Sequence, residues 1–242
     1  GSLSSAPNAW TFSGHGGLDG LTAGMTEAEA AAAGGSFGFA LALQDVKGSV
    51  LHDGDGWVDF GPAGGSYYYS RPRMAARGTL TLDGQQLRVT GSVWFDHQWG
   101  DFISVGGGGW DWFAVNLSDG TDLTLSLVRN ADGSLPLVYG TIVDATGEAA
   151  HLGPHDFTVA ATGSWTSPTT GIAYPSGWRL TIPGKDLTID LVPTLPNQEL
   201  DTRATTGVVY WEGSQVVRAS RAGTNLDGEA YVELTGYGPP TP

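Results

Sequence analysis

The chain has 242 residues, and its 11 Lys and Arg against 25 Asp and Glu give a formal net charge of −14. This acidity excludes a non-specific nucleic-acid binder, whose phosphate contacts need clustered Lys and Arg, and argues against docking on an anionic membrane. The 38 glycines, 9 tryptophans, 8 tyrosines and 8 phenylalanines predict tight turns between aromatic-rich strands. With 40% hydrophobic residues the chain can fill a core, so disorder is not expected.

The absence of cysteine excludes disulfides and thiolate metal sites. It leaves the compartment open: the cytoplasm is slightly favoured, and a signal peptide that has been removed is the alternative. No apolar run approaches the ~18 residues of a transmembrane helix, so no membrane-spanning segment is expected.

Short strand-like segments dominate the sequence and predict an all-β antiparallel sandwich or barrel. Asp83-Gly84 and Asp119-Gly120 each predict a tight hairpin turn between two of these segments. The expected strands cover residues 36–43, 66–74, 78–82, 86–95, 110–117, 121–128, 135–143, 157–161, 178–182, 187–192, 208–211, 215–220 and 230–235. Thr26 and Glu29 form a capping box that predicts one short helix, although a surface turn fits as well.

The glycine-rich stretch 61–65 is the best candidate for a boundary. We therefore expect an N-terminal strand-rich segment over residues 1–65, a partial first barrel or linker layer. A C-terminal barrel over residues 66–237 and a frayed tail over 238–242 would follow.

The densest group of reactive side chains is the segment 94–100, Trp-Phe-Asp-His-Gln-Trp-Gly. On an extended strand His97 and Trp99 share one face, while Trp94 and Asp96 share the other. A carboxyl held against Trp is desolvated, which raises its pKa, and a neighbouring His could relay the proton. The alternative is that Asp96 ends the strand and His97 is a half-buried structural histidine, and the spacing alone slightly favours it.

Asp111 lies between Trp110 and Trp112 and would share a strand face with Phe113. A carboxyl in so apolar a setting must be paired or protonated, so it is either a general acid or a structural hydrogen-bond acceptor. The four glycines 106–109 before it predict a loop that can rearrange over a pocket.

Tyr67, Tyr68 and Tyr69 could donate hydrogen bonds from an apolar wall, while Arg71 and Arg73 are more often structural partners of carboxylates. No nucleophile elbow, phosphate loop, dinucleotide fingerprint or zinc-helix motif is present, so neither a metal nor another cofactor is expected.

Seven motifs occur in an order that is similar to the carotenoid 1,2-hydratase (hydroxyneurosporene synthase) and AttH-like lipocalin-fold family, which also includes polyene Diels–Alderases. They lie at residues 67–70, 94–100, 109–113, 174–175, 198–199, 210–213 and 231–237, and the resemblance covers about 36–237. It implies two packed lipocalin-like β-barrel units. The front of the chain is short for the family, so the N-terminal barrel would be reduced, with Trp10–His15 as a remnant of a paired-Trp motif.

The resemblance implies one of two reactions. In water addition to a terminal double bond, Asp111 would donate the proton, and His97 and Trp99 would line a pocket that stabilises the cation. In 4+2 cycloaddition of a polyene polyketide, a shaped apolar cavity would fold the substrate, with Asp111, Tyr67 and Trp99 as donors or stacking surfaces. Asp96 completes the expected catalytic set. The residues expected to contact substrate are Trp99, Trp110, Trp112, Tyr67, Tyr69, Trp94, Trp211 and Glu212.

We favour cyclisation, because Gln98 follows His97 where hydratase-like members often carry an acidic residue. Hydration is the alternative, and a non-catalytic lipocalin-like protein that binds an apolar ligand is the third hypothesis. The expected partner is a long apolar small molecule, and a homodimer is compatible with the sequence.

Overall fold

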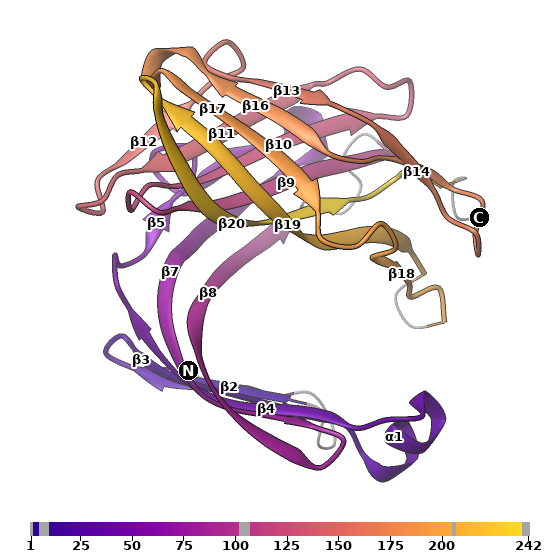
Figure 1. Ribbon diagram of the computed structural model, residues 1–242. Coiled ribbons are helices and arrows are strands. Elements are labelled where there is room, and N and C mark those ends of the chain that lie inside the picture. The colour runs from indigo at the N-terminus through magenta and orange to yellow at the C-terminus, as the bar shows by residue number, and fades with distance from the viewer. Residues whose placement is uncertain (1, 5–9, 102–106, 205–206, 239–242) are drawn as a thin grey trace. The chain divides into compact units, whose positions relative to one another are not determined.

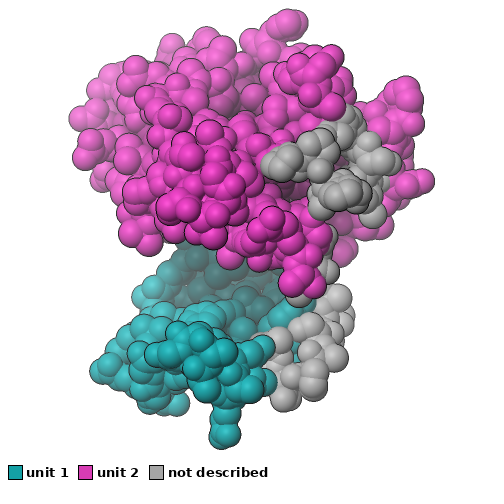
Figure 2. Space-filling model, turned by 90° about the vertical axis from the view of Figure 1, so that its right-hand side faces the viewer, with its two compact units in different colours: residues 1–50, 70–96 teal, residues 51–69, 97–242 magenta. Residues whose placement is uncertain are grey.

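The computed structural model describes residues 2–4, 10–101, 107–204 and 207–238, and these fold into antiparallel sheets with one short α-helix (Figure 1). The prediction of an all-β antiparallel fold is confirmed. The described residues form two compact units, coloured in Figure 2. Unit 1 holds residues 1–50 and 70–96, and unit 2 holds residues 51–69 and 97–242. The units are thus interleaved along the chain, and the expected folding domains 1–65 and 66–237 stay a prediction.

The sheet of unit 1 runs in the order β1-β2-β3-β4-β7, and β8 pairs with β7. Its first elements are β1 (Ser2–Ser4), β2 (Trp10–His15), β3 (Leu18–Gly24), α1 (Glu27–Ala33) and β4 (Phe37–Asp45). The predicted helix is confirmed, because the Thr26 side chain accepts from the Glu29 backbone and the Glu29 side chain accepts from the Thr26 backbone.

Two long strands, β7 (Gly65–Leu82) and β8 (Gln85–Asp101), run through both units. The sequence predicted separate strands over 66–74 and 78–82, but they are one strand. The turn between β7 and β8 is the expected two-residue hairpin. Asp83 and Gly84 have φ values of +48° and +77°, as a type I′ turn requires.

Unit 2 begins with two short strands that pair with β7, namely β5 (Val50–Leu51), which starts at the unit boundary, and β6 (Trp57–Asp59). The 3-10 turn η1 (Gly61–Ala63) follows them. Its main sheet has the order β12-β11-β10-β9-β20-β19-β17-β16-β13, with β18 paired to β19. The bounds are β9 (Gly107–Leu117), β10 (Asp122–Asn130), β11 (Leu137–Val143), β12 (Ala149–Leu152), β13 (Thr158–Ala161), β16 (Trp178–Ile182), β17 (Leu187–Pro193), β18 (Glu199–Asp201), β19 (Val209–Arg221) and β20 (Thr224–Leu234). A separate pair, β14 (Ser164–Thr166) and β15 (Ala173–Pro175), and the 3-10 turn η2 (Pro183–Lys185) complete it.

The glycine segment before Asp111 differs from its expectation. Gly107–Gly109 belong to β9 and are not part of a loop, while Gly106 lies outside the described residues. Close packing explains the glycines: a Cβ on Gly108 would lie 2.1 Å from the Asn130 carbonyl oxygen, and one on Gly109 would lie 2.4 Å from that of Thr235.

The main core of unit 2 lies on the inner face of its curved sheet. Phe113, Val115, Leu125 and Trp178 are at most 1% exposed there. A second, small cluster of Val58, Tyr68 and Tyr139 forms where β6 and β7 meet that sheet. No helix in the described part of the chain is long and apolar enough to cross a membrane.

His52 lies beside this small cluster, 1% exposed, with its ring 4.0 Å from that of Tyr68 and its Nδ1 2.9 Å from the Thr141 hydroxyl. Burial lowers the pKa of His52 to about 4, so the imidazole is neutral in the folded protein at pH 7.

We expect His52 to make folding pH-dependent. Between pH 6.5 and 4 the unfolded chain binds a proton that folded His52 does not, so the free energy of unfolding falls as pH drops. The loss is about 3 kcal/mol for a pKa shift of this size. His52→Gln should remove this slope in chemical denaturation from pH 7 to 4, with the exposed His155→Gln as control. Parallel profiles for wild type and His52→Gln would contradict the assignment.

Candidate functional site

Four of the predicted site residues gather on one face of β7 and β8, within unit 2. The ring of Tyr67 stacks on Trp99 at 5.4 Å, His97 lies 4.7 Å from Trp99, and Tyr69 lies 5.6 Å from His97. Trp57 extends the group at 4.9 Å from Tyr67. Tyr67 is 51% and Trp99 46% exposed, so these five rings, here called the aromatic cluster, offer apolar surface to a ligand.

The residues between these rings point to the opposite face, because side chains alternate along a strand. Tyr68 is 4% exposed, and its hydroxyl accepts a 2.9 Å hydrogen bond from Nε1 of Trp112 on β9. Gln98 Nε2 donates to the Ser66 hydroxyl at 2.8 Å. The middle tyrosine of the triplet therefore anchors β7 to the main sheet, and its neighbours are left to form the aromatic cluster.

Asp111 lies on the inner face of β9, where Arg129 and Tyr237 hold it. Arg129 Nη1 forms an ion pair with Asp111 Oδ1, and the Tyr237 hydroxyl donates to both carboxylate oxygens at 3.0 Å. Arg129 Nη2 donates to the Thr235 carbonyl, and its guanidinium lies 4.3 Å from the centre of the Tyr237 ring. We call Asp111, Arg129 and Tyr237 the carboxylate site.

Opposing effects act on the carboxyl of Asp111. Burial raises its pKa above the usual value, and this effect outweighs the charge of Arg129 and the hydrogen bonds from Arg129 and Tyr237, which lower it. Burial and the Asp111 charge raise the pKa of Tyr237. The site can therefore keep a proton on Asp111 at a higher pH than a free aspartate would, at the expense of its ion pair.

The sequence analysis did not identify Arg129 or Tyr237. A two-residue turn at Asp119-Gly120 would pair Asp111 with Val128, which puts Arg129 on the other face. In the structure Asp111 pairs with Leu127, because the turn also includes Ser118 and Gly120 alone has a positive φ of +85°. Tyr237 was within a recognised motif, but nothing in the sequence places it beside Asp111.

Trp110 and Trp112 lie on the outer face of β9, opposite Asp111. Trp110 Nε1 donates to Glu233 Oε1 at 3.2 Å. Glu233 pairs in register with both Trp112 and Glu212, so these residues form one row across β9, β20 and β19. Burial raises the pKa of Glu212.

Three other predicted residues lie elsewhere. Trp211 is 1% exposed in the core of unit 2, where its Nε1 donates to the Pro196 carbonyl at 3.0 Å. Trp94 and Asp96 belong to unit 1, and Asp96 accepts a hydrogen bond from the Ser70 hydroxyl. The alternative in which Asp96 ends its strand is wrong, since β8 continues to Asp101. Roles of all three in catalysis or substrate binding stay predictions.

Within the residues that the structure describes, no three His, Cys, Asp or Glu side chains are grouped as metal ligands would be. The carboxylate site has a single carboxyl whose oxygens already accept from Arg129 and Tyr237. Its chemistry is therefore that of a buried acid with two neighbouring donors.

A protein-family model described as AttH-like matches residues 7–237. A comparison with curated proteins found no significant match. Among solved structures, an AttH-type protein from Nitrosomonas europaea superposes with a TM-score of 0.80 at 29% identity, covering 95% of this chain and 68% of that one.

Two further solved structures share the fold at lower identity. Kievitone hydratase from Nectria haematococca has a TM-score of 0.72 at 20% identity, covering 90% of this chain and 64% of that one. CghA with Sch210972 has a TM-score of 0.53 at 12% identity, covering 98% of this chain and 74% of that one. The chain thus spans about two thirds to three quarters of the length of these proteins.

Because the carboxylate site is buried, removing its positive charge should destabilise the protein more than removing the positive charge of an exposed ion pair. Arg129→Met leaves the Asp111 carboxylate buried without its cation, and we expect the free energy of unfolding at pH 8 to fall by about 3–5 kcal/mol. The deficit should shrink as pH is lowered, because protonation of Asp111 removes the buried charge.

Urea denaturation at several pH values measures this effect. The matched control is Arg179→Met, which breaks an exposed ion pair with Asp190 and should lower the free energy of unfolding far less than Arg129→Met does. Asp111→Asn combined with Arg129→Met should recover part of the loss. Equal costs for Arg129→Met and Arg179→Met would refute a tight buried pair.

Proposed function

The chain belongs to the AttH-like family, and from this premise we propose that it is an enzyme that binds a long apolar polyene or polyketide and cyclises it by 4+2 cycloaddition. The observation that carries the proposal is the aromatic cluster, in which exposed rings from β7 and β8 lie within stacking distance of one another. A conjugated chain can lie against such rings, since aromatic pairs prefer offset or edge contacts 4.5–7 Å between centres.

Cycloaddition fits the chemistry of this site. A diene and an alkene form two carbon–carbon bonds without gaining or losing an atom, so the protein mainly has to hold one folded conformation of the substrate. A hydrogen-bond donor to a conjugated carbonyl would lower the barrier further, and we assign that role to protonated Asp111. Asp111 lies on the inner face of β9, whereas the aromatic cluster lies on the other side of the Tyr68–Trp112 contact, so this role requires a substrate that reaches both places. Its raised pKa supports the assignment, because burial favours the neutral acid.

Hydration of a double bond is the second candidate, and the same raised pKa of Asp111 favours it. Asp111 would transfer its proton fully to an alkene carbon, and an aromatic face beside that carbon would stabilise the cation until water adds and returns a proton to the carboxylate. The two reactions share their substrate class and differ in whether the Asp111 proton is transferred or only shared.

Products from a panel of linear polyenes, both carotenoids and carbonyl-capped polyketides, test the proposal by mass spectrometry. We expect a product of unchanged mass and new retention time. Trp99→Ala should lower its kcat/KM by about tenfold, whereas Leu195→Ala, which removes an exposed apolar side chain outside the cluster, should not. A product one water heavier would establish hydration instead. Polyene recovered unchanged would support the non-catalytic binding hypothesis.

Asp111→Asn separates the two reactions. The amide oxygen can still accept from Arg129 and Tyr237, and the amide NH2 group can donate hydrogen bonds, but the side chain cannot transfer a proton. Cyclisation should therefore persist within about tenfold, while hydration should fall by about 100-fold or more. The measurement is the single-turnover rate with saturating polyene. Cyclisation that disappears in this variant would contradict the role of Asp111 as a simple donor.

A further inference from the structure

The sheet of unit 1 carries its apolar side chains on one face. Register pairs Phe12 with Leu21, Leu21 with Leu41, and Phe39 with Leu80, so these side chains form rows on the same side of β2, β3, β4 and β7. The other face carries mainly threonine, alanine and glycine. The apolar face of a sheet is normally buried against another layer, yet all five of these side chains stay partly exposed.

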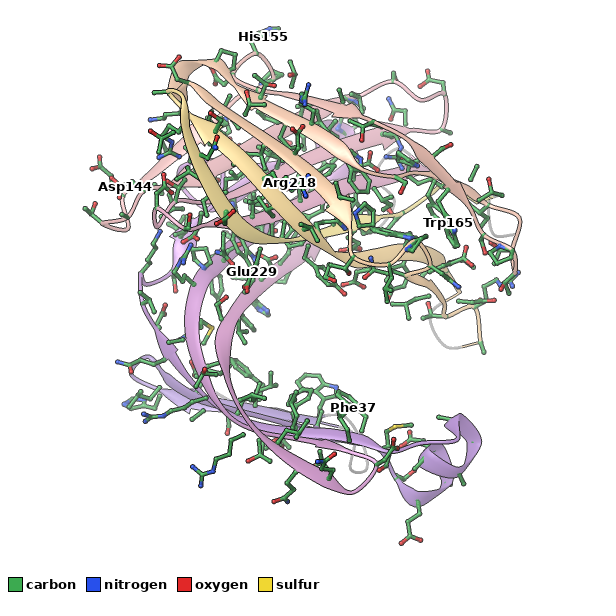
Figure 3. The ribbon with its side chains drawn as sticks, viewed as in Figure 1. Phe37, Asp144, His155, Trp165, Arg218 and Glu229 are labelled. Atoms are coloured by element: carbon green, nitrogen blue, oxygen red, sulfur yellow. The ribbon has the colours of Figure 1, made fainter. Side chains whose placement is uncertain are left out.

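Burial changes from one end of this apolar face to the other. At the open end Trp10, Phe37 and Leu82 are 40%, 45% and 43% exposed, and Figure 3 shows Phe37 on the concave side of the sheet. At the closed end Leu43 and Met74 are 2% and 0% exposed. The face, here called the trough, therefore has an accessible apolar end at Phe37 and a buried end at Leu43 and Met74.

The trough is curved along its whole width. Phe12 of β2 stacks on Phe95 of β8 with their centres 5.1 Å apart and their planes at 17°. These strands are separated by β3, β4 and β7 in the sheet order, so the sheet curls until its two sides touch. An elongated molecule entering at Phe37 would lie against the apolar face between these two sides of the sheet.

Arg71 lies near the closed end and has an unused donor. Its Nη1 is 2.5 Å from Asp19 and its Nε is 2.7 Å from Asp45, two carboxylates on the apolar side of the sheet. Its Nη2 is buried and has no hydrogen-bond partner among the described residues, and Arg71 as a whole is 9% exposed. A buried donor without a partner is rare in folded proteins and indicates a group that completes it.

We propose that the trough of unit 1 is a second binding site, separate from the aromatic cluster, for an elongated apolar molecule that ends in a neutral carbonyl oxygen. The apolar chain would lie along Phe39, Leu41 and Leu80, and the oxygen would accept from Arg71 Nη2. This inference does not depend on the proposed function, which rests on residues of unit 2.

The local charge selects a neutral oxygen over a carboxylate. One guanidinium faces two carboxylates, so the group has a net charge of −1 before a ligand arrives, and an anionic end group would be repelled. Met74 pairs in register with Asp45 at the closed end, and its unbranched thioether side chain can repack to let the oxygen reach the guanidinium.

Methyl retinoate and retinoic acid test the site, because they share one polyene skeleton and differ in the charge of the end group. Their dissociation constants are measured on the full chain by quenching of tryptophan fluorescence, in wild type and in a Trp99→Ala background that weakens binding at the aromatic cluster. We expect the ester to bind at least about tenfold more tightly than the acid. Phe37→Ser, at the exposed end of the trough, should raise the dissociation constant of the ester by about tenfold.

Leu18→Ser is the matched control, since Leu18 is 62% exposed on the opposite face of the same sheet. Its dissociation constants should stay within about twofold of wild type. Arg71→Lys keeps the positive charge but lacks Nη2. It should raise the dissociation constant of the ester about fivefold and leave that of the oxygen-free probe N-phenyl-1-naphthylamine unchanged. If Arg71→Lys does not fold, the comparison of Phe37→Ser with Leu18→Ser decides whether the ester binds at the trough.

Equal effects of Phe37→Ser and Leu18→Ser would overturn the proposal, as would acid binding as tight as ester binding. Sedimentation that shows a dimer lost in Phe37→Ser, with ester affinity unchanged, would assign the trough to a second copy of the chain instead. Ester binding that depends on Trp99 alone would remove the second site and leave the proposed function intact. Turnover that is unchanged in Trp99→Ala would contradict the proposed function and leave the second binding site intact.

Discussion

Side chains alternate between the two faces of a strand. In β7, β8 and β9 this alternation determines which side chains lie in the core and which are exposed. In each strand, consecutive residues serve different purposes. Tyr68 anchors β7 to Trp112, while Tyr67 and Tyr69 stand on the other side with Trp99. On β9, Asp111 points into the core side and its two tryptophan neighbours point out. A compact aromatic motif thus supplies buried structural groups to one surface and exposed aromatic groups to another.

Both units place an arginine at the inner side of a curved apolar sheet, with different charge balance. Arg129 has one carboxylate, Asp111, and a tyrosine hydroxyl completes the group. Arg71 has two carboxylates, Asp19 and Asp45, and its Nη2 has no hydrogen-bond partner within the described part of the chain. Because buried charges must be paired, each arginine fixes strands that are distant in sequence. The balanced group in unit 2 can exchange a proton, whereas the unit 1 group is completed by an acceptor from outside.

The sequence alone was enough for the fold class, the short helix and the Asp83-Gly84 hairpin, because these depend on local signals. It also placed His97 and Trp99 on one face, since a period of two is a property of any strand. The carboxylate site could not be predicted from the sequence. A three-residue turn shifts the register of β9 against β10 by one residue, and that shift alone decides whether Arg129 meets Asp111. Tyr237 reaches Asp111 from 126 residues away, a contact that no local pattern encodes. Arg71 was expected to be a structural partner, and its two ion pairs agree.

The interleaving of the two units along β7 and β8 has a consequence for synthesis on the ribosome. Unit 1 draws on residues up to 96, so its sheet can close once the first two fifths of the chain have emerged. Unit 2 must wait, because β9 pairs with β20 and the Tyr237 hydroxyl binds Asp111, so residues 224–237 must be made first. Until then the edge of β9 that pairs with β20 is open, and Asp111 has Arg129 but not Tyr237 as a partner. The order of translation therefore gives the nascent protein a finished trough before it has a finished carboxylate site.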